Sequence, residues 1–327
     1  MQETGTSSAG NRSRWRPLDS ARGIAVIAMI LYHACWNLIY FGILPQDILH
    51  SLGWKLSGGT IAAAFLAISG ASLTLAHSGG FRSNLFWKRL LKIAAAAALV
   101  SIATWFLFPD SFIFFGILHC LAVTSLLALP FLKAPAWLCA VASFCALFAP
   151  YLFRQSFWDI PWLDWIGFGI STPVTNDYVP VFPWLGFVLA GLLLGRIFIG
   201  RYSIGSGNIL SRMLVWAGRW SLAIYLIHQP LLFGATQLIA TSGLLAPYQI
   251  TSQQVLQKCQ ERCDSAEGDP ALCRATCSCI IGDLSAKPEH ASLWENLRNN
   301  KVSRQDSHRI QMIAESCSER LVLQNMK

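Results

Sequence analysis

Charged residues are scarce in this chain. They make up 13% of its 327 residues, whereas hydrophobic residues make up 54%. This balance excludes an ordinary soluble domain, in which about a quarter of the residues are charged. The charge is also unevenly placed: residues 1–249 hold 15 Lys or Arg and 7 Asp or Glu, and residues 250–327 hold 10 of each. The sequence therefore predicts an apolar membrane body followed by a small polar tail.

Long apolar runs fill the body. The hydrocarbon core of a bilayer is about 30 Å thick, so a spanning helix needs about 20 mostly apolar residues. The first run lacks a small-x-small cleavage site and is too long for the apolar core of a signal peptide, so we expect it to remain as a span. Seven runs qualify: 21–44, 58–76, 90–108, 112–132, 136–153, 179–199 and 220–240.

The predicted fold class is an all-α polytopic transmembrane helix bundle of about seven spans with a small cysteine-rich helical tail. Its parts are a basic N-terminus over 1–20, a membrane domain over 21–245 and the tail over 250–327. Lys and Arg concentrate in cytoplasmic loops. Thirteen of the fifteen in the body fall in the N-terminus and alternate loops, and only Lys55 and Arg154 fall elsewhere. We therefore expect a cytoplasmic N-terminus and an outer tail.

The tail holds six of the ten cysteines. An even number in a small polar segment indicates an oxidising compartment. Cys259 and Cys263, like Cys273 and Cys277, are four residues apart, which places each pair on one helix face. Between the pairs, Gly268-Asp269-Pro270 predicts a turn with Asp269 as N-cap and Pro270 at the first helical position.

Two antiparallel helices would bring these cysteines together as nested disulfides. The predicted pairing is Cys259–Cys277, Cys263–Cys273 and Cys279–Cys317. A four-thiolate zinc site is an alternative that the same spacing permits. The other four cysteines lie in predicted spans, where we expect them to pack: Cys35, Cys120, Cys139 and Cys145.

Histidines inside the spans are the first candidates for function, because ionisable groups are costly there. His33, His119 and His228 each lie at least seven residues inside a predicted span. For each, a neutral packing histidine is the alternative. Arg22 and His33 are 11 residues apart, so they share a helix face with about 16 Å between them. Asn37, one turn beyond His33, is placed to orient its ring.

The predicted outer loop 154–180 combines tryptophans with acids. Trp158, Trp162 and Trp165 accompany Asp159, Asp164 and Asp177. Aromatic rings with carboxylates are typical of a carbohydrate site, and equally of an interfacial aromatic belt. At its end, the segment from Asp177 to Trp184 contains two prolines, which predict a rigid and bent entry to the next span.

Several segments resemble a known family. Leu18-Asp19-Ser20-Ala21-Arg22-Gly23, followed by His33, resembles the opening of the membrane acyltransferase superfamily. The chain is most similar to bacterial proteins with the heparan-α-glucosaminide N-acetyltransferase catalytic domain. The supporting segments, in order between about residues 14 and 235, are Phe65–Ser72, Lys88–Lys92, Phe115–His119, Asp177–Trp184 and Gly218–Pro230.

The resemblance implies an N- or O-acetyltransferase of the bacterial inner membrane. Acetyl-CoA or another acyl-CoA would be the co-substrate, bound from the cytoplasm. The acceptor would be an amino sugar or glycan on the far side. Membrane lipid is the expected surrounding partner; no metal and no nucleic acid is expected. His33 matches the first-helix histidine of the superfamily, whereas Asn37 stands where many relatives are expected to carry an acid.

Acyl transfer from a thioester needs a base to take the acceptor's proton, and imidazole has a suitable pKa. The predicted catalytic residues are His33 and Asn37. Arginine and lysine suit the phosphates of CoA, and the predicted donor site is Asp19, Arg22, Arg82, Lys88, Arg89 and Arg219. The predicted acceptor site is His119, Asp177, Tyr178, Trp184 and His228.

Two alternatives belong to other functional classes. A membrane haem electron carrier would use paired histidines, here His119 and His228, as iron ligands. A transporter would also place polar groups at mid-membrane, although the chain shows no convincing inverted repeat.

Overall fold

The computed structural model describes residues 15–198, 208–245, 248, 251–264, 269–299 and 302–325. Throughout these residues the secondary structure is helical and contains no strand, which confirms the all-α prediction. The chain divides into two compact units, residues 1–33 with 52–231 and residues 34–51 with 232–327. Most of the predicted basic N-terminus, including Arg12 and Arg14, lies outside the described residues, as do Arg201 and Gly268.

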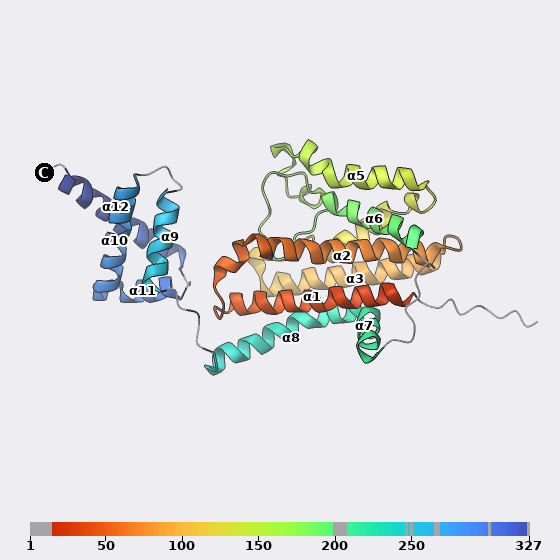
Figure 1. Cartoon of the computed structure of the whole chain (residues 1–327), viewed down its shortest axis with the longest axis horizontal. Helices are drawn as coiled ribbons and strands as arrows, with labels where there is room; N and C mark the ends of the chain where they lie inside the picture. The colour runs from red at the N-terminus through yellow and green to blue at the C-terminus, as the bar shows by residue number, and fades with distance from the viewer. Residues whose placement is uncertain are drawn as a thin grey trace, which may run out of the picture. The chain divides into compact units, whose positions relative to one another are not determined.

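Within the described residues, six helices are long and apolar enough to cross a membrane. Each has 18 to 26 residues and is therefore about 27–39 Å long. They match six of the seven predicted spans and make the chain a membrane protein. They are α1 (Arg16–Tyr40), α2 (Leu52–His77), α3 (Ser83–Leu107), α5 (Ala136–Phe153), α6 (Val181–Phe198) and α8 (Ser221–Ser242) (Figure 1).

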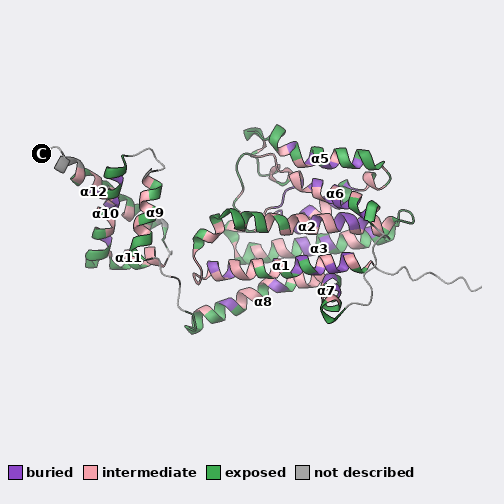
Figure 2. Ribbon diagram, in the orientation of Figure 1, coloured by how far each residue is buried: buried purple, intermediate pink, exposed green. Residues whose placement is uncertain are grey.

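Large apolar side chains are exposed along these helices. In Figure 2 much of α5 is green, the colour of exposed residues. Leu91, Phe106 and Phe144 are examples. A contiguous apolar surface of this kind would aggregate in water, whereas lipid solvates it. The buried side chains instead form a core between the helices, with Leu66, Leu189 and Leu192 at its centre.

The predicted span 112–132 differs from the others. Its helix, α4 (Ile117–Leu127), has only 11 residues and is about 16 Å long. Val179 N, just before α6, donates to Phe115 O at 3.2 Å. In the last turn of α6, Arg196 Nη1 donates to Ala134 O at 2.7 Å. The segment therefore runs the length of α6, partly extended and partly helical.

Non-helical backbone within the membrane must find polar partners inside the protein. For residues 112–117 these partners are side chains of α3, α4 and the loop before α6. Ser101 Oγ donates to Ile113 O (2.6 Å), Ile113 N to Thr104 Oγ1 (3.0 Å), Gly116 N to His119 Nδ1 (3.2 Å) and Ile117 N to Asp177 Oδ2 (3.0 Å). These bonds explain how the chain tolerates a broken span.

Small residues let several helices approach closely. A side chain added at Gly70 on α2 would collide with Val188 O on α6, and one at Gly191 with Ala67 O. Close contact through glycine is common between membrane helices, because the backbones themselves then pack. This contact fixes α2 against α6 and thereby the polar face of α2.

Helix α7 (Ile209–Arg219) is too short to cross a membrane. Its Gly218 lies against the backbone of Asp19 at the start of α1. Ile209, Met213 and Trp216 form an exposed apolar stripe on the opposite face. This pattern is typical of a helix lying in the membrane interface.

The second unit contains the tail helices α9 (Ser252–Asp264), α10 (Pro270–Ala286), α11 (Ala291–Arg298) and α12 (Arg304–Asn325). Asp269 caps α10, since its side chain accepts from Ala271 N at 3.0 Å.

Short 3₁₀ helices occur between the α-helices of both units. Those in the described residues are η1 (Gln46–His50), η2 (Pro109–Ser111), η3 (Pro130–Leu132), η4 (Ser156–Trp158), η5 (Asp164–Ile166) and η6 (Pro288–His290).

Three disulfides join the tail helices, and all three predicted pairs are confirmed. They are Cys259–Cys277, Cys263–Cys273 and Cys279–Cys317. Leu284, Leu293 and Ile313 form a small core beside them. Such bonds supplement a core that is too small to stabilise a unit of this size alone.

The tail also contacts the loop that follows α1. Lys258 Nζ lies 2.7 Å from Asp47 Oδ2, and Tyr248 N donates to Gly42 O at 2.8 Å. The tail therefore meets the loop between α1 and α2.

Thiol titration of the unreduced, denatured protein should find four free cysteines, because six are bonded. Alkylation followed by mass mapping should modify the four unpaired cysteines: Cys35, Cys120, Cys139 and Cys145. Ten reactive thiols, or zinc that a chelator removes, would contradict the disulfides.

Candidate active site

Arg22 organises a polar cluster near the start of α1. Its Nη1 lies 3.0 Å from Asp19 Oδ1, and its Nη2 donates to Ser72 Oγ on α2 at 2.6 Å. Nη1 also lies 3.4 Å from Gly218 O on α7. Asp19 is buried, so it is a counter-charge built into the protein rather than a surface acid. Arg22 thus joins three helices.

Two further arginines complete this arginine cluster, which consists of Arg22, Arg89 and Arg219. Arg89 Nη2 donates to Ser69 Oγ at 2.8 Å, and Arg219 Nε lies 3.7 Å from Asp19 Oδ2. Ser69 and Ser72 are one turn apart, so Arg22 and Arg89 reach the same side of α2. Arg22 and Arg219 are paired with the single carboxylate of Asp19, and Arg89 lies on the same side of α2 as Arg22. The cluster therefore has an excess of positive charge, which suits a polyanionic ligand.

Two other residues of the predicted donor site lie at the start of α3. Arg82 precedes its first turn and Lys88 lies in its second; both are exposed. In the described part of the chain, neither donates to a residue of the arginine cluster. Their role in donor binding stays a prediction.

A pair of histidines lies further along α1. His33 on α1 and His228 on α8 have ring centroids 5.0 Å apart. His228 is buried, and its Nδ1 lies 2.7 Å from Tyr225 O. His33 is half-buried beside Tyr32, which stacks on Trp54 at 4.0 Å. The sequence predicted both histidines as site residues but contained no signal that they would meet.

His119 does not join this pair. It lies in the first turn of α4, where Nε2 is 3.2 Å from Ser101 Oγ and Nδ1 accepts from Gly116 N. Asp177 is beside it and accepts from Ile117 N, as a carboxylate at a helix N-terminus does. His119 and Asp177 thus both hold the broken span, a structural task that the sequence did not reveal.

Two further predicted acceptor residues follow: Tyr178 in the same loop and Trp184 in the first turn of α6. Tyr178 Oη donates to Asp164 O at 2.6 Å, and Trp184 packs on Phe187 with ring centroids 5.6 Å apart. Burial raises the pKa of the Asp177 carboxyl, and burial together with the Asp164 carboxylate raises the pKa of Tyr178 to about 12. The loop thus holds a desolvated carboxyl group and a phenol beside half-buried aromatic rings.

Asn37 is fully buried on α1. It belongs to the second compact unit, whereas His33 belongs to the first. Its assistance to His33 stays a prediction.

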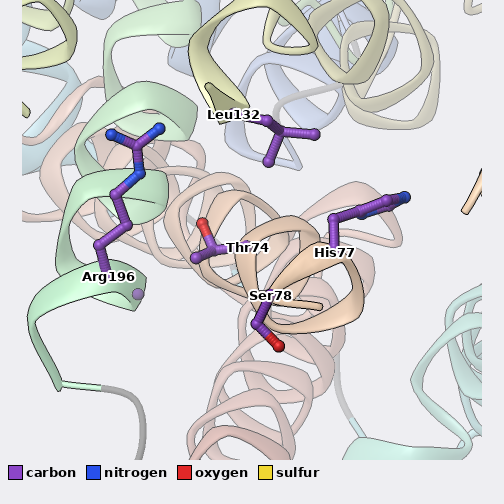
Figure 3. Close-up of a pocket in the computed structure, with 6 residues that line it drawn as sticks. Thr74, His77, Ser78, Leu132 and Arg196 are labelled. Carbon is purple, nitrogen blue, oxygen red and sulfur yellow. The ribbon is translucent and has the colours of Figure 1, made fainter. Parts of the chain in front are cut away.

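A pocket of about 310 Å³ lies elsewhere in the first unit. Figure 3 shows Thr74 and His77 of α2, Ser78 just after α2 and Arg196 of α6, which are among the residues that line it. None of the predicted site residues lines it, and the Arg196 guanidinium is already bonded to the carbonyls of Phe131 and Ala134. The arginine cluster and the histidine pair, rather than this pocket, are therefore the candidate active site.

Within the described ranges, no group of three or more His, Cys, Asp or Glu residues is placed to hold a metal ion.

Comparison with known proteins gives one match. The family model described as "Heparan-alpha-glucosaminide N-acetyltransferase, catalytic" matches residues 14–230. This range includes all three residues of the arginine cluster and both histidines of the pair. No curated protein matches the chain, and no solved structure matches it.

The contact of α7 with α1 gives a prediction about stability. Gly218→Ala should destabilise the protein by about 1–3 kcal/mol, because the new methyl group would strike Asp19 O. Gly234→Ala is the matched control on α8: nothing lies near its added methyl group, so the change should be neutral or stabilise by about 0.5–1 kcal/mol. Thermal unfolding in detergent measures both, and equal melting temperatures would rule out the close contact.

Proposed function

Because the chain belongs to the family of the heparan-α-glucosaminide N-acetyltransferase catalytic domain, we propose that it is a membrane acyltransferase using acyl-CoA. An acetyl or other acyl group would pass from cytoplasmic acyl-CoA to an amino sugar or glycan on the outer side. The observation that carries this proposal is the arrangement along α1, where an arginine cluster and a histidine pair share one helix.

The arginine cluster is the proposed donor site. CoA carries several phosphate charges, and a cluster of three guanidinium groups, two of them paired with Asp19, suits such a ligand. Arg22 and His33 are separated by about 16 Å along α1. An extended pantetheine arm reaches over several helical turns, so phosphates bound at Arg22 would allow the thioester to approach His33.

The chemistry proposed for His33 is proton transfer. The acceptor's nitrogen or oxygen attacks the thioester carbonyl, and His33 takes the acceptor's proton as the new bond forms. The carbon–sulfur bond then breaks, and the CoA sulfur leaves with that proton as a free thiol. An acyl group carried on His33 itself is the covalent variant of the same reaction.

The proposed acceptor site lies in the loop before α6 and at the start of α4, where Asp177, Tyr178 and His119 lie. A desolvated carboxyl group and aromatic rings are suited to a sugar, whose hydroxyls need hydrogen bonds and whose faces stack on rings. We place this side of the protein outside.

The proposed orientation has a cytoplasmic N-terminus and an outer tail in a bacterial inner membrane. The distribution of Lys and Arg in the loops supports it. The three disulfides support an oxidising compartment for the tail. The contact between Lys258 and Asp47 supports it too, because Asp47 lies in the loop at the far end of α1.

The haem and transporter alternatives gain no support from the structure. The haem alternative paired His119 with His228, whereas His228 lies against His33 and His119 is bonded to Ser101 and Gly116. A purified protein with a Soret absorption band would favour haem. Release of CoA thiol from acetyl-CoA, measured with a panel of amino sugars, would favour the transferase.

His33→Ala tests the proposed base. The variant should insert and fold, and its turnover should fall by roughly 100- to 10,000-fold, as expected when a general base is lost. Thiol release measures the rate, and size-exclusion chromatography in detergent measures folding. Near-normal transfer by well-folded His33→Ala protein would refute the assignment.

Arg22→Ala tests the donor site. It should chiefly raise the KM for acyl-CoA, because a phosphate contact binds donor equally in the ground and transition states. Arg212→Ala is the matched control, since Arg212 is an exposed arginine of α7 outside the cluster. An equal change in KM for both variants would indicate general electrostatic attraction rather than a site.

Reporter fusions after residue 245 test the orientation. A periplasmic reporter should be active there and a cytoplasmic reporter inactive. The reverse result would place the tail with the N-terminus and leave its disulfides in a reducing compartment.

A further inference from the structure

The hydrogen bond of His228 determines its tautomer. A carbonyl oxygen only accepts, so the Nδ1 that lies 2.7 Å from Tyr225 O must carry the proton. The neutral ring then has an unprotonated Nε2 with a free lone pair. The fold thus presents one defined face of His228, a hydrogen-bond acceptor.

This acceptor is buried and unmatched. Within the described residues, His228 Nε2 has no hydrogen-bond partner, although the residue is only 8% exposed. A buried acceptor without a donor is unfavourable. The neighbouring ring is that of His33, with centroids 5.0 Å apart and planes tilted by 59°. Because the Tyr225 carbonyl holds the His228 ring, a rotation of the His33 ring would be what brings one of its N–H groups toward this lone pair.

We propose that His228 is a positioning residue for His33. Its Nε2 accepts the N–H of one His33 nitrogen, which leaves the other His33 nitrogen unprotonated and directed at the substrate. The resulting chain runs from Tyr225 O through His228 to His33. The inference rests on the proposed acyl transfer and gives its base a defined tautomer.

Every proton that moves in this arrangement is accounted for. The free nitrogen of His33 takes the acceptor's proton, while the other His33 N–H remains hydrogen-bonded to His228 Nε2. The imidazolium so formed is stabilised by that lone pair, which is otherwise unused. The proton then goes to the CoA sulfur as the carbon–sulfur bond breaks, and both histidines return to their starting states.

His77 provides a comparison within the same chain. Its Nδ1 lies 2.9 Å from Leu73 O, and its Nε2 is likewise buried without a partner in the described residues. Its neighbouring rings, however, are Phe81 and Phe86, which have no N–H to offer. Both histidines bond a carbonyl of their own helix, but His77 has phenylalanine rings beside it, whereas His228 has the imidazole ring of His33. His77→Phe is therefore a matched control.

The first experiment compares three variants by thiol release. His228→Phe should lower kcat by about 10- to 100-fold, the loss expected when a partner that orients a histidine is removed. The KM for acyl-CoA should stay unchanged. His228→Gln should recover part of the loss, because its amide oxygen can accept from His33. His77→Phe should retain the wild-type kcat. An equal loss in His228→Phe and His77→Phe, or a change confined to KM, would overturn the proposal.

The second experiment is a double-mutant cycle. If His228 acts only through His33, then His33→Ala/His228→Phe should be no slower than His33→Ala alone. Additive losses would show that His228 acts on its own or supports the fold, and would reject the positioning role.

A third measurement does not depend on catalysis. In the ¹⁵N spectrum of histidine-labelled protein, the signal missing from His228→Phe identifies His228. His33→Ala should shift its Nε2 resonance, and His77→Phe should not. A wild-type protein without thiol release would defeat the proposed function, yet this shift would still establish the pair. An unshifted resonance would remove the pair whatever the activity.

Discussion

The hydrogen bonds of Arg22 hold together the elements from which the site is built. The guanidinium reaches Asp19 on its own helix, Ser72 on α2 and Gly218 on α7. A cation within a membrane protein is stable only where such partners are fixed. Because α1 is a continuous helix, fixing Arg22 at its start also fixes the position of His33 three turns along. The proposed donor site and the proposed catalytic histidine therefore share one rigid support.

The broken span 112–132 shows the same requirement that polar groups within the membrane find partners inside the protein. An extended stretch within the membrane exposes backbone groups that lipid cannot satisfy. Here Asp177 and His119 supply two of the partners. These two residues also form part of the proposed acceptor site. The side chains that satisfy the broken span would therefore also lie beside the substrate, and the need for polar partners would explain both features.

The sequence predicted the parts of this protein governed by local periodicity. Six spans and the tail hairpin follow from apolar length, helical spacing and the Asp269 cap, and the disulfide pairing follows from the spacing. The short helix α4 was not predicted, because its start depends on Asp177, sixty residues away. The contact of His33 with His228 was not predicted either, since it depends on how α1 packs on α8. Contacts of long sequence separation leave no local pattern.

The partner of His33 also suits its surroundings. The polar residue one turn beyond His33 is Asn37, so α1 places no carboxylate beside the histidine in sequence. A carboxylate would orient imidazole and stabilise its cation, but it would introduce a second charge into a region where charge is costly. In the proposed pair, His228 is held by a backbone carbonyl and orients the His33 ring through neutral groups. A charge then forms on His33 only during the reaction. The Nε2 lone pair of His228 can therefore accept a hydrogen bond from His33 without placing a permanent ion in the membrane interior. This is the physical advantage of a histidine pair over a histidine–carboxylate pair at this depth.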